Sequence, residues 1–195
     1  MIVPLHLFPS IGWFQRVSQT DSIMVDGFEN WVKQSHRNRF DIVGPNGRQS
    51  LSIPTVKASR HRFIDVEISY SEDWITKHLR SVETAYNRSP FFEFYAHEFK
   101  DLLNKRHNLL FDLNLAAVKW CFAKLNVDMS VSTTTSFDSE DVDEKFHLLE
   151  YPISYYQVFQ DKNDFLENVS ILDLLFNVGP EALATLLHKP PLSQI

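Results

Sequence analysis

Cysteine, glycine and long apolar runs are scarce in this 195-residue sequence, and each scarcity excludes a class of protein. The one cysteine, Cys121, excludes a disulfide within the chain, which agrees with a reducing compartment. With only five glycines, the chain has neither a GxxxxGK[ST] loop nor a GxGxxG turn for binding phosphates. No apolar run approaches the roughly 18 residues of a membrane helix, and the first residues lack the basic region of a signal peptide. We therefore expect a cytoplasmic protein without a membrane span.

The charged residues are unevenly distributed. The formal net charge is −6, yet residues 16–62 hold eight Lys and Arg against four Asp and Glu, whereas residues 137–195 hold three against eleven. A local positive field in an acidic chain suits a small anionic ligand, because a nucleic-acid backbone usually needs a broad basic surface. We therefore expect a small anionic ligand and no nucleic-acid partner.

Apolar and turn residues predict several short strands within one domain, residues 1–195. Strands are expected at 2–8, 22–26, 63–69, 128–134 and 155–159. Two further arms, 38–43 and 49–55, flank Gly44-Pro45-Asn46-Gly47, which is a hairpin signal.

Helices are predicted where apolar residues recur at helical spacing and capping residues precede them. The expected helices cover residues 10–19, 74–86, 90–105, 109–125, 170–177 and 180–187. A Ser69-Glu72 capping box precedes the second helix, and Ser89 is expected to cap the third, with Pro90 at its first position. The acidic run 138–144 predicts a solvated loop, and the tail from Pro190 is expected to be loose. Together these patterns predict an α/β or α+β fold, in which a mixed sheet from the N-terminal strands and the hairpin packs against a group of helices.

The segment 31–39, WVKQSHRNR, holds three fixed cations and a histidine. Each arginine offers a fork of donors that fits phosphate or carboxylate, and lysine offers a point charge. If the segment is extended, Lys33, Arg37 and Arg39 share one face. We predict that these three bind a pyrophosphate or carboxylate in a cleft with Asp26, and that Asn38 either orients the arginines or closes a turn.

The three cations also have readings without a ligand. They could be solvated surface charges, or Arg39 could pair with Asp41 or Asp65. If they do bind a ligand, alanine at Arg37 or Arg39 abolishes binding and changes stability little.

Four other polar residues are candidates for the site. His6, at the carboxyl end of the first strand, faces the usual ligand crevice of α/β proteins, or is a half-buried strand histidine. Asp26 ends the second strand and is either a base or amine-binding group, or a turn residue. Asp173 and Asn177 lie four residues apart on one helix face and reach into the site, or they only cap and end that helix.

The residues leave the cofactor unknown and indicate no metal site. His107, His147 and His188 have no partner at ligand spacing, and HExxH is absent. No GxSxG elbow is present, although a spatial Ser/His/Asp triad stays open.

Four separated segments resemble the WbqC-like family: PLHLFPSIGWF, VDGFENWVKQSHRNR with its GPNG hairpin, TKHLRSVETAYNRSPFFE and NVSILDLLFNVGPEAL. The family is associated with surface-polysaccharide gene clusters of the O-antigen type, and a glycine-transferase role has been suggested for members. Longer members carry a YLSG segment that this chain lacks.

The resemblance implies a transferase that moves glycine or another acyl group to a nucleotide-linked amino sugar. Asp26 or His6 would take the proton from the attacking amine, and ATP or a carrier would activate the acyl group. The alternative is a non-enzymatic binding or assembly protein that works with polysaccharide-synthesis enzymes. A lesser alternative rests on SVSTTT at 130–135, which is vaguely similar to the second phosphate-binding motif of HIGH-type nucleotidyltransferases.

Overall fold

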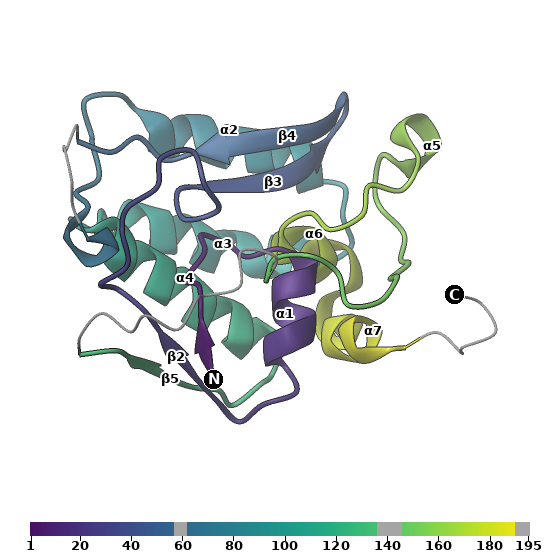
Figure 1. Cartoon of the computed structure of the whole chain (residues 1–195). Coiled ribbons are helices and arrows are strands. Elements are labelled where there is room, and N and C mark those ends of the chain that lie inside the picture. Colours follow the sequence, from purple (N-terminus) through teal and green to yellow (C-terminus); the bar gives the residue numbers. More distant parts are fainter. Residues whose placement is uncertain (57–61, 136–145, 190–195) are drawn as a thin grey trace.

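Strands and helices combine in an α+β arrangement in the computed structural model, which describes residues 1–56, 62–135 and 146–189 (Figure 1). Strands β1 (Ile2–Val3), β2 (Ser22–Val25) and β5 (Ser130–Thr133) form a parallel sheet in the order β1-β2-β5. Strands β3 (Arg39–Gly44) and β4 (Gly47–Ser52) form an antiparallel hairpin. The predicted α+β class is confirmed, but the N-terminal strands and the hairpin form two separate sheets and not one mixed sheet, because among the described strands no ladder joins β1, β2 or β5 to β3 or β4.

The hairpin forms where the Gly-Pro-Asn-Gly segment predicts it. Gly44 pairs with Gly47, whose φ of 97° is favourable only for glycine. The ladder ends at the pair of Arg39 with Ser52, just before Pro54, which has no N–H to extend it.

Helices surround both sheets. They are α1 (Ile11–Val17), α2 (Trp74–Tyr86), α3 (Phe92–Asn104), α4 (Leu110–Lys124), α5 (Gln160–Asn163), α6 (Ile171–Val178) and α7 (Ala182–Leu187), with 3-10 turns η1 (Phe63–Asp65) and η2 (Gly179–Glu181). Figure 1 shows α3 and α4 between the two sheets, α2 along the hairpin, and α6 and α7 next to α1. None of the helices in the described part of the chain has both the length and the apolar character needed to cross a membrane.

Two predicted strands are not strands. Residues 63–69 form η1 and isolated bridges, because the N–H groups of Phe63 and Ile64 donate to the carbonyls of Glu29 and Gly27. Residues 155–159 are irregular until the turn that leads into α5.

Two helix starts also differ from prediction. Asp73, not Ser69, caps α2 by accepting the Thr76 N–H at 3.2 Å. Helix α3 begins at Phe92 because the Ser89 hydroxyl, expected to cap it, donates to Asn177 instead. The predicted acidic loop 138–144 lies outside the described residues, as does the tail from Pro190.

The core is rich in aromatic rings. The fully buried Phe176 on α6 packs against Tyr86, Phe92 and Phe99 with ring centroids 5.0, 5.2 and 6.2 Å away. Cys121 is buried in the same core, where burial raises the pKa of its thiol. The sheet and the helices therefore close around one continuous hydrophobic cluster.

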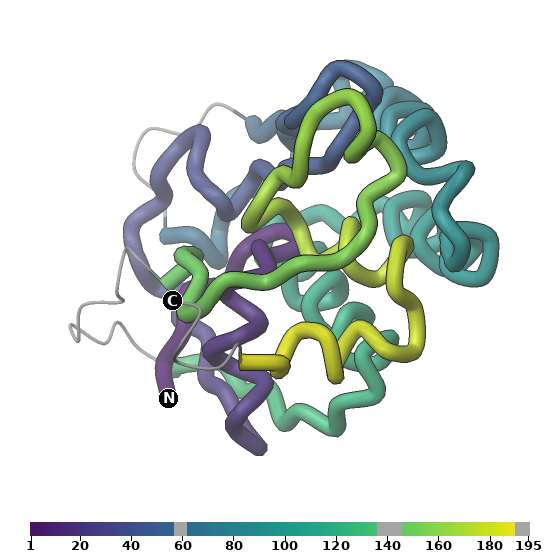
Figure 2. Tube along the Cα trace, turned by 90° about the vertical axis from the view of Figure 1, so that its right-hand side faces the viewer, coloured from purple at the N-terminus to yellow at the C-terminus, as the bar shows by residue number. Residues whose placement is uncertain are grey.

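Residues 146–170 form a strap that crosses α1 and reaches the hairpin (Figure 2). The His147 carbonyl accepts the Ser10 hydroxyl at 2.7 Å, and the Asn163 amide donates to the Gly44 carbonyl at 3.1 Å. A Cβ at Gly12 would lie 2.4 Å from the Leu148 carbonyl carbon, so only glycine lets α1 and the strap approach this closely. This contact brings the N-terminal and C-terminal parts of the chain to one site.

Candidate functional site

The basic segment 31–38 folds back on itself and is not extended. Gln34 has a φ of 57°, and the Asn38 N–H donates to the Ser35 carbonyl at 3.2 Å. Trp31 turns inward and stacks on Phe63, with ring centroids 5.9 Å apart. The cations therefore do not form the row along one face that an extended segment would give.

Arg37 is paired within the protein. Its guanidinium forms a two-pronged ion pair with Glu29, with a distance of 2.7 Å from Nε to Oε1. The side chains of Arg37 and Glu29 are only 15% and 12% exposed, and the guanidinium lies over the Phe63 ring. The Arg37 guanidinium therefore holds the segment to Glu29, and its paired donors are already used within the protein.

Asn38 and Arg39 connect this segment to the hairpin, whereas Lys33 points into solvent. The Asn38 amide donates to the Ile53 carbonyl at 3.1 Å, and the Ile53 N–H donates back to the Asn38 carbonyl. Arg39 donates through Nε to the Ser52 hydroxyl at 3.0 Å across the ladder. Neither alternative partner of Arg39 is used, because Asp41 pairs with Arg48 and Asp65 with Arg62.

Asp26 lies at the carboxyl end of β2 and forms no ion pair with the residues that the structure describes. It is 1% exposed, and its Oδ1 accepts the Phe28 N–H at 2.8 Å and the Thr134 hydroxyl at 2.9 Å. The carboxylate thus joins the turn after β2 to the residue after β5.

Asp173 and Asn177 lie in the core on α6 rather than beside the basic segment. Asp173 accepts the Tyr155 hydroxyl at 2.6 Å and the Gln157 amide at 2.8 Å, and burial raises the pKa of its carboxyl. Asn177 donates to the Asp173 carbonyl and accepts the Ser89 hydroxyl at 3.1 Å. The two residues hold α6 to the strap and to the start of α3.

Two of the predicted residues, His6 and Arg39, do line one recess. It has a volume of about 20 Å³, the size of one small group such as water or a primary amine. His6, His36 and His147 form a row beside it, with ring centroids 5.2 and 4.4 Å apart. Its remaining walls come from the turn into α1, the start of β3 and the strap: Leu7, Phe8, Pro9, Ser10, Phe40, Asp41, Asn168 and Ser170.

The His6 imidazole is the chemically distinctive group of this recess. Burial lowers the pKa of His6 well below its usual value, and the electrostatic effect of His36, Arg37 and His147 lowers it further. The ring is therefore neutral near pH 7, and its buried Nδ1 has no hydrogen-bond partner among the described residues. A neutral ring nitrogen of this kind can accept a proton from an entering N–H or O–H group.

Local sequence patterns contain no direct signal for the other residues at the recess. Ser10 and His147 are 137 positions apart, and only the strap brings them together. Asn168 reaches the same region, where its amide donates to the His147 carbonyl at 2.9 Å and its Oδ1 accepts the Gly12 N–H. Its φ of 53° is a hint, because asparagine tolerates the left-handed region better than most residues.

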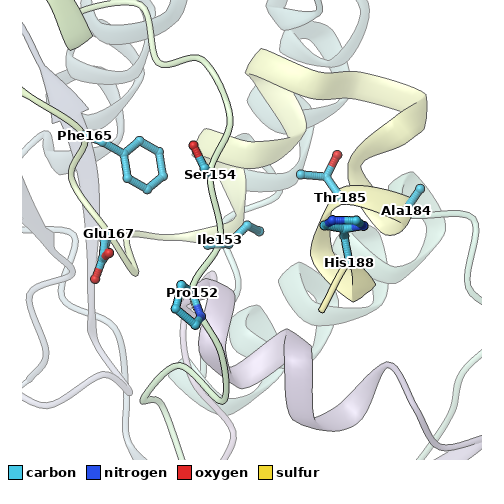
Figure 3. Close-up of a pocket in the computed structure, with 8 residues that line it drawn as sticks. All are labelled: Pro152, Ile153, Ser154, Phe165, Glu167, Ala184, Thr185 and His188. Carbon is cyan, nitrogen blue, oxygen red and sulfur yellow. The ribbon is translucent and has the colours of Figure 1, made fainter. Parts of the chain in front are cut away.

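A second, larger pocket opens on the other side of the strap (Figure 3). Its volume is about 760 Å³, within the range of about 300 to 1,000 Å³ typical of small-molecule sites. Figure 3 shows residues 152–154 between Phe165 and Glu167 on one side and α7 on the other. It is lined by Pro152, Ile153, Ser154, Phe165, Glu167, Ala184, Thr185 and His188.

Metal ligands do not gather in the described part of the chain. Within residues 1–56, 62–135 and 146–189, no group of three or more His, Cys, Asp and Glu could hold a metal ion. The row of His6, His36 and His147 is a set of tilted ring contacts.

Comparisons with known proteins extend over most of the chain. The chain is 25% identical over 217 residues to "Uncharacterized protein Rv1507c" of Mycobacterium tuberculosis (strain ATCC 25618 / H37Rv), an alignment that covers 93% of this chain and 94% of the relative. No solved structure matches. The profile of the WbqC-like protein family matches residues 5–149 and 130–185, which include the residues that line the recess and those that line the second pocket, except His188. The chain therefore belongs to the WbqC-like protein family.

Proposed function

We propose that this protein is a transferase of surface-polysaccharide synthesis of the O-antigen type. It moves glycine or another acyl group to a nucleotide-linked amino sugar, and the histidine recess is the reacting centre. Membership of the WbqC-like family supports the biological setting. The observation that carries the chemistry is the buried His6 ring, whose Nδ1 is without a partner among the described residues, in a recess shared with Arg39.

His6 serves as the general base in this proposal. The amine of the acceptor enters the recess and attacks the carbonyl carbon of an activated acyl donor. A C–N bond forms, the bond from carbon to the leaving group breaks, and the leaving group takes the electron pair. The amine proton passes to Nδ1 of His6, which accepts it in the tautomer with hydrogen on Nε2.

An anionic substrate strengthens this base. The pKa of His6 is lowered by burial and by the electrostatic effect of His36, Arg37 and His147. A phosphate near Arg39 has the opposite electrostatic effect, so it raises the pKa of His6 and makes the ring a better proton acceptor when the substrate is bound. His6 is then a stronger base in the substrate complex than in the free protein.

The other predicted residues take supporting roles. Arg39, which has guanidinium nitrogens beyond the Nε that donates to Ser52, binds the anionic group, and the exposed Lys33 adds positive charge to the same basic segment. Arg37, Asn38 and Asp26 position the segment through the contacts that they make with the protein. Asp173 and Asn177 hold the strap and α6 that form the far wall.

Binding and turnover of the full chain test this function. We expect nucleotide-linked amino sugars to stabilise the protein in thermal-shift measurements, and a mass-spectrometric assay to detect acyl transfer when glycine is supplied with ATP or a carrier. His6→Gln should retain binding and lose about 10²-fold or more in turnover. His97→Gln is the matched control, because His97 is an exposed residue on α3 that pairs with Asp101.

Arg39 tests the anion-binding part of the same proposal. Arg39→Ala should weaken nucleotide-sugar binding, Arg39→Lys should restore it in part, and Arg88→Ala at an exposed position should leave it unchanged. Absence of stabilisation by every phosphorylated ligand well above ~1 mM would overturn the proposal.

A binding or assembly role is the second candidate, and one observation favours it. Phe94 on α3 is 74% exposed and Tyr156 on the strap is 61% exposed, and aromatic rings are among the side chains that are enriched at protein interfaces. In this case, Phe94→Ala should weaken association with a polysaccharide-synthesis enzyme, and His6→Gln should have no effect on it.

A further inference from the structure

The pocket between the strap and α7 has polar side chains that the fold does not use. Among the described residues, no hydrogen bond involves the side chains of Ser154, Glu167, Thr185 or His188. Ser154, Glu167 and His188 are exposed, while the Ile153 floor between them is only 6% exposed. Two hydroxyls, a carboxylate and an imidazole thus surround an apolar floor.

An aromatic ring completes the pocket. Phe165 is half-buried and is held edge-on by Tyr155, with ring centroids 5.1 Å apart. Tyr155 is itself fixed by its hydrogen bond to the buried Asp173. The Phe165 ring therefore has a supported position, and its face can take the C–H groups of a ligand.

The charge of the lining residues restricts the ligand. The pocket has one carboxylate, from Glu167, and neither lysine nor arginine among its lining residues. A phosphate would meet this carboxylate without a fixed cation to offset it, so the pocket disfavours phosphorylated groups. Hydroxyl and amino groups, in contrast, can donate to Glu167 and exchange hydrogen bonds with Ser154 and Thr185.

We infer that this pocket binds a non-phosphorylated sugar residue, with the ring of the sugar against Phe165 and its hydroxyl or amino groups directed to Glu167, Ser154 and Thr185. The volume of about 760 Å³ has room for a monosaccharide and part of an attached group. Sugar binding itself stands apart from the histidine recess. Only the assignment of this sugar as a part of the transfer acceptor, separate from the amine that reacts at His6, rests on the proposed function.

The strap connects the sugar pocket to the recess of His6 through two adjacent residues. Glu167 lines the sugar pocket and its chain neighbour Asn168 lines the recess of His6. Arg48 fixes this part of the strap by donating to the Glu167 carbonyl, which leaves the carboxylate available. A ligand that spans Glu167 and Asn168 would present one end to the sugar pocket and the other to His6.

Calorimetric titration of the full chain with glucose, glucosamine and glucose 1-phosphate tests the inference. The first two should bind with a Kd of about 1 mM, which is a modest affinity suited to a single open subsite. Phe165→Ala should weaken the binding of glucose and glucosamine at least fivefold. Phe165→Leu should weaken it as well, because leucine keeps most of the apolar volume but lacks the aromatic face. Glu167→Gln should weaken glucosamine about tenfold and glucose less, because the charge-assisted hydrogen bond is lost.

Control variants elsewhere in the chain separate an effect on the pocket from a general effect on the protein. Glu93→Gln removes an exposed carboxylate on α3, and Phe28→Ala removes a half-buried ring that packs under Arg62, so both variants should leave sugar binding unchanged. Sugar binding that survives in both Phe165 variants and in Glu167→Gln overturns the inference, and so does the absence of sugar binding. Tighter binding of glucose 1-phosphate than of glucose, lost in Phe165→Ala, overturns the exclusion of phosphate.

The transfer assay separates this inference from the proposed function. Phe165→Ala should raise the KM for the acceptor and keep kcat, while His6→Gln should lower kcat. Sugar binding without any transfer refutes the transferase and leaves the sugar site intact. Transfer with an unchanged acceptor KM in Phe165→Ala refutes the sugar site as the acceptor site and leaves the transferase intact.

Discussion

The basic segment 31–39 and the pocket between the strap and α7 are both polar, but they use their polar side chains differently. In the basic segment, Arg37 pairs with Glu29, Asn38 bonds to Ile53, and Arg39 bonds to Ser52. In the pocket, Ser154, Glu167, Thr185 and His188 have no side-chain hydrogen bond with the described part of the protein. A dense cluster of charge in a sequence can therefore be structural, while scattered and ordinary residues assemble a pocket.

The strongest test of this comparison is the ion pair of Arg37. Replacing Arg37 with alanine leaves the Glu29 carboxylate, 12% exposed in the pair, without its cation. We expect the free energy of unfolding to fall by about 3 kcal/mol in urea titration. This is the opposite of the small change that the sequence pattern predicts for a ligand-binding arginine.

Arg39→Ala is the matched control for that experiment. Arg39 makes an exposed hydrogen bond to Ser52, so the change in unfolding free energy should stay within about 1 kcal/mol. Equal losses of stability in the two alanine variants would show that the segment is structural throughout, and an unchanged Arg37→Ala variant would show that the ion pair contributes little.

The second test is the protonation of buried histidines, which should change the free energy of unfolding by a similar amount. His78 on α2 is buried against Trp74 and Phe40, and burial lowers its pKa to about 4. The unfolded chain takes up this proton near pH 6.5, so the free energy of unfolding should fall as the pH drops from about 6.5 to about 4. The loss from His78 is on the order of 3 kcal/mol, and His6 adds to it in the same direction.

Variants at His78 assign this pH dependence. His78→Leu should flatten the curve of unfolding free energy against pH between about 4 and 6.5, as measured by urea titration at each pH. His97→Leu, at the exposed position on α3, should leave the slope unchanged. A slope that is the same in wild type and His78→Leu would contradict the role of burial here.

The contact between α1 and the strap is the third test, with an intermediate effect. Gly12→Ala places a methyl group 2.4 Å from the backbone of Leu148, and backbone atoms cannot move aside as a flexible side chain can. We expect a loss of about 2 kcal/mol in thermal or urea unfolding, together with weaker ligand binding in the recess. Alanine at Gly44, where the nearest atom is 3.5 Å away on the Gln49 side chain, should cost less.

Local patterns predicted most of the fold because they act over a few residues. The hairpin signal of Gly44 to Gly47 and the helical spacing of 74–86 and 109–125 are confirmed within a few positions. The strand expected at 63–69 failed because backbone bonds to Gly27 and Glu29, more than thirty positions away, decide its form. The cap expected at Ser89 failed because Asn177 competes for its hydroxyl.

The site was harder to predict because its parts come from distant segments. His6 and Arg39 were recognisable by residue type and by their place at a strand end or in a basic run. His36 and His147, in contact at a ring distance of 4.4 Å, meet only because the strap returns across α1. Whether a charged group is already paired, as Arg37 is, depends on the same long-range contacts and leaves no mark in the local sequence.

The smallest expected effect is on the stability of a pocket variant, and it completes the comparison. Glu167 is exposed, its side chain has no hydrogen bond within the described residues, and Arg48 holds only its backbone carbonyl. Glu167→Gln keeps the size of the side chain and removes its charge, so the free energy of unfolding should change by less than about 0.5 kcal/mol. Urea titration without ligand measures this, with Glu29→Gln, which breaks the pair with Arg37, as the contrasting variant. A loss above about 1 kcal/mol in Glu167→Gln would mean that the fold does use this carboxylate, and the distinction between the two regions would fail.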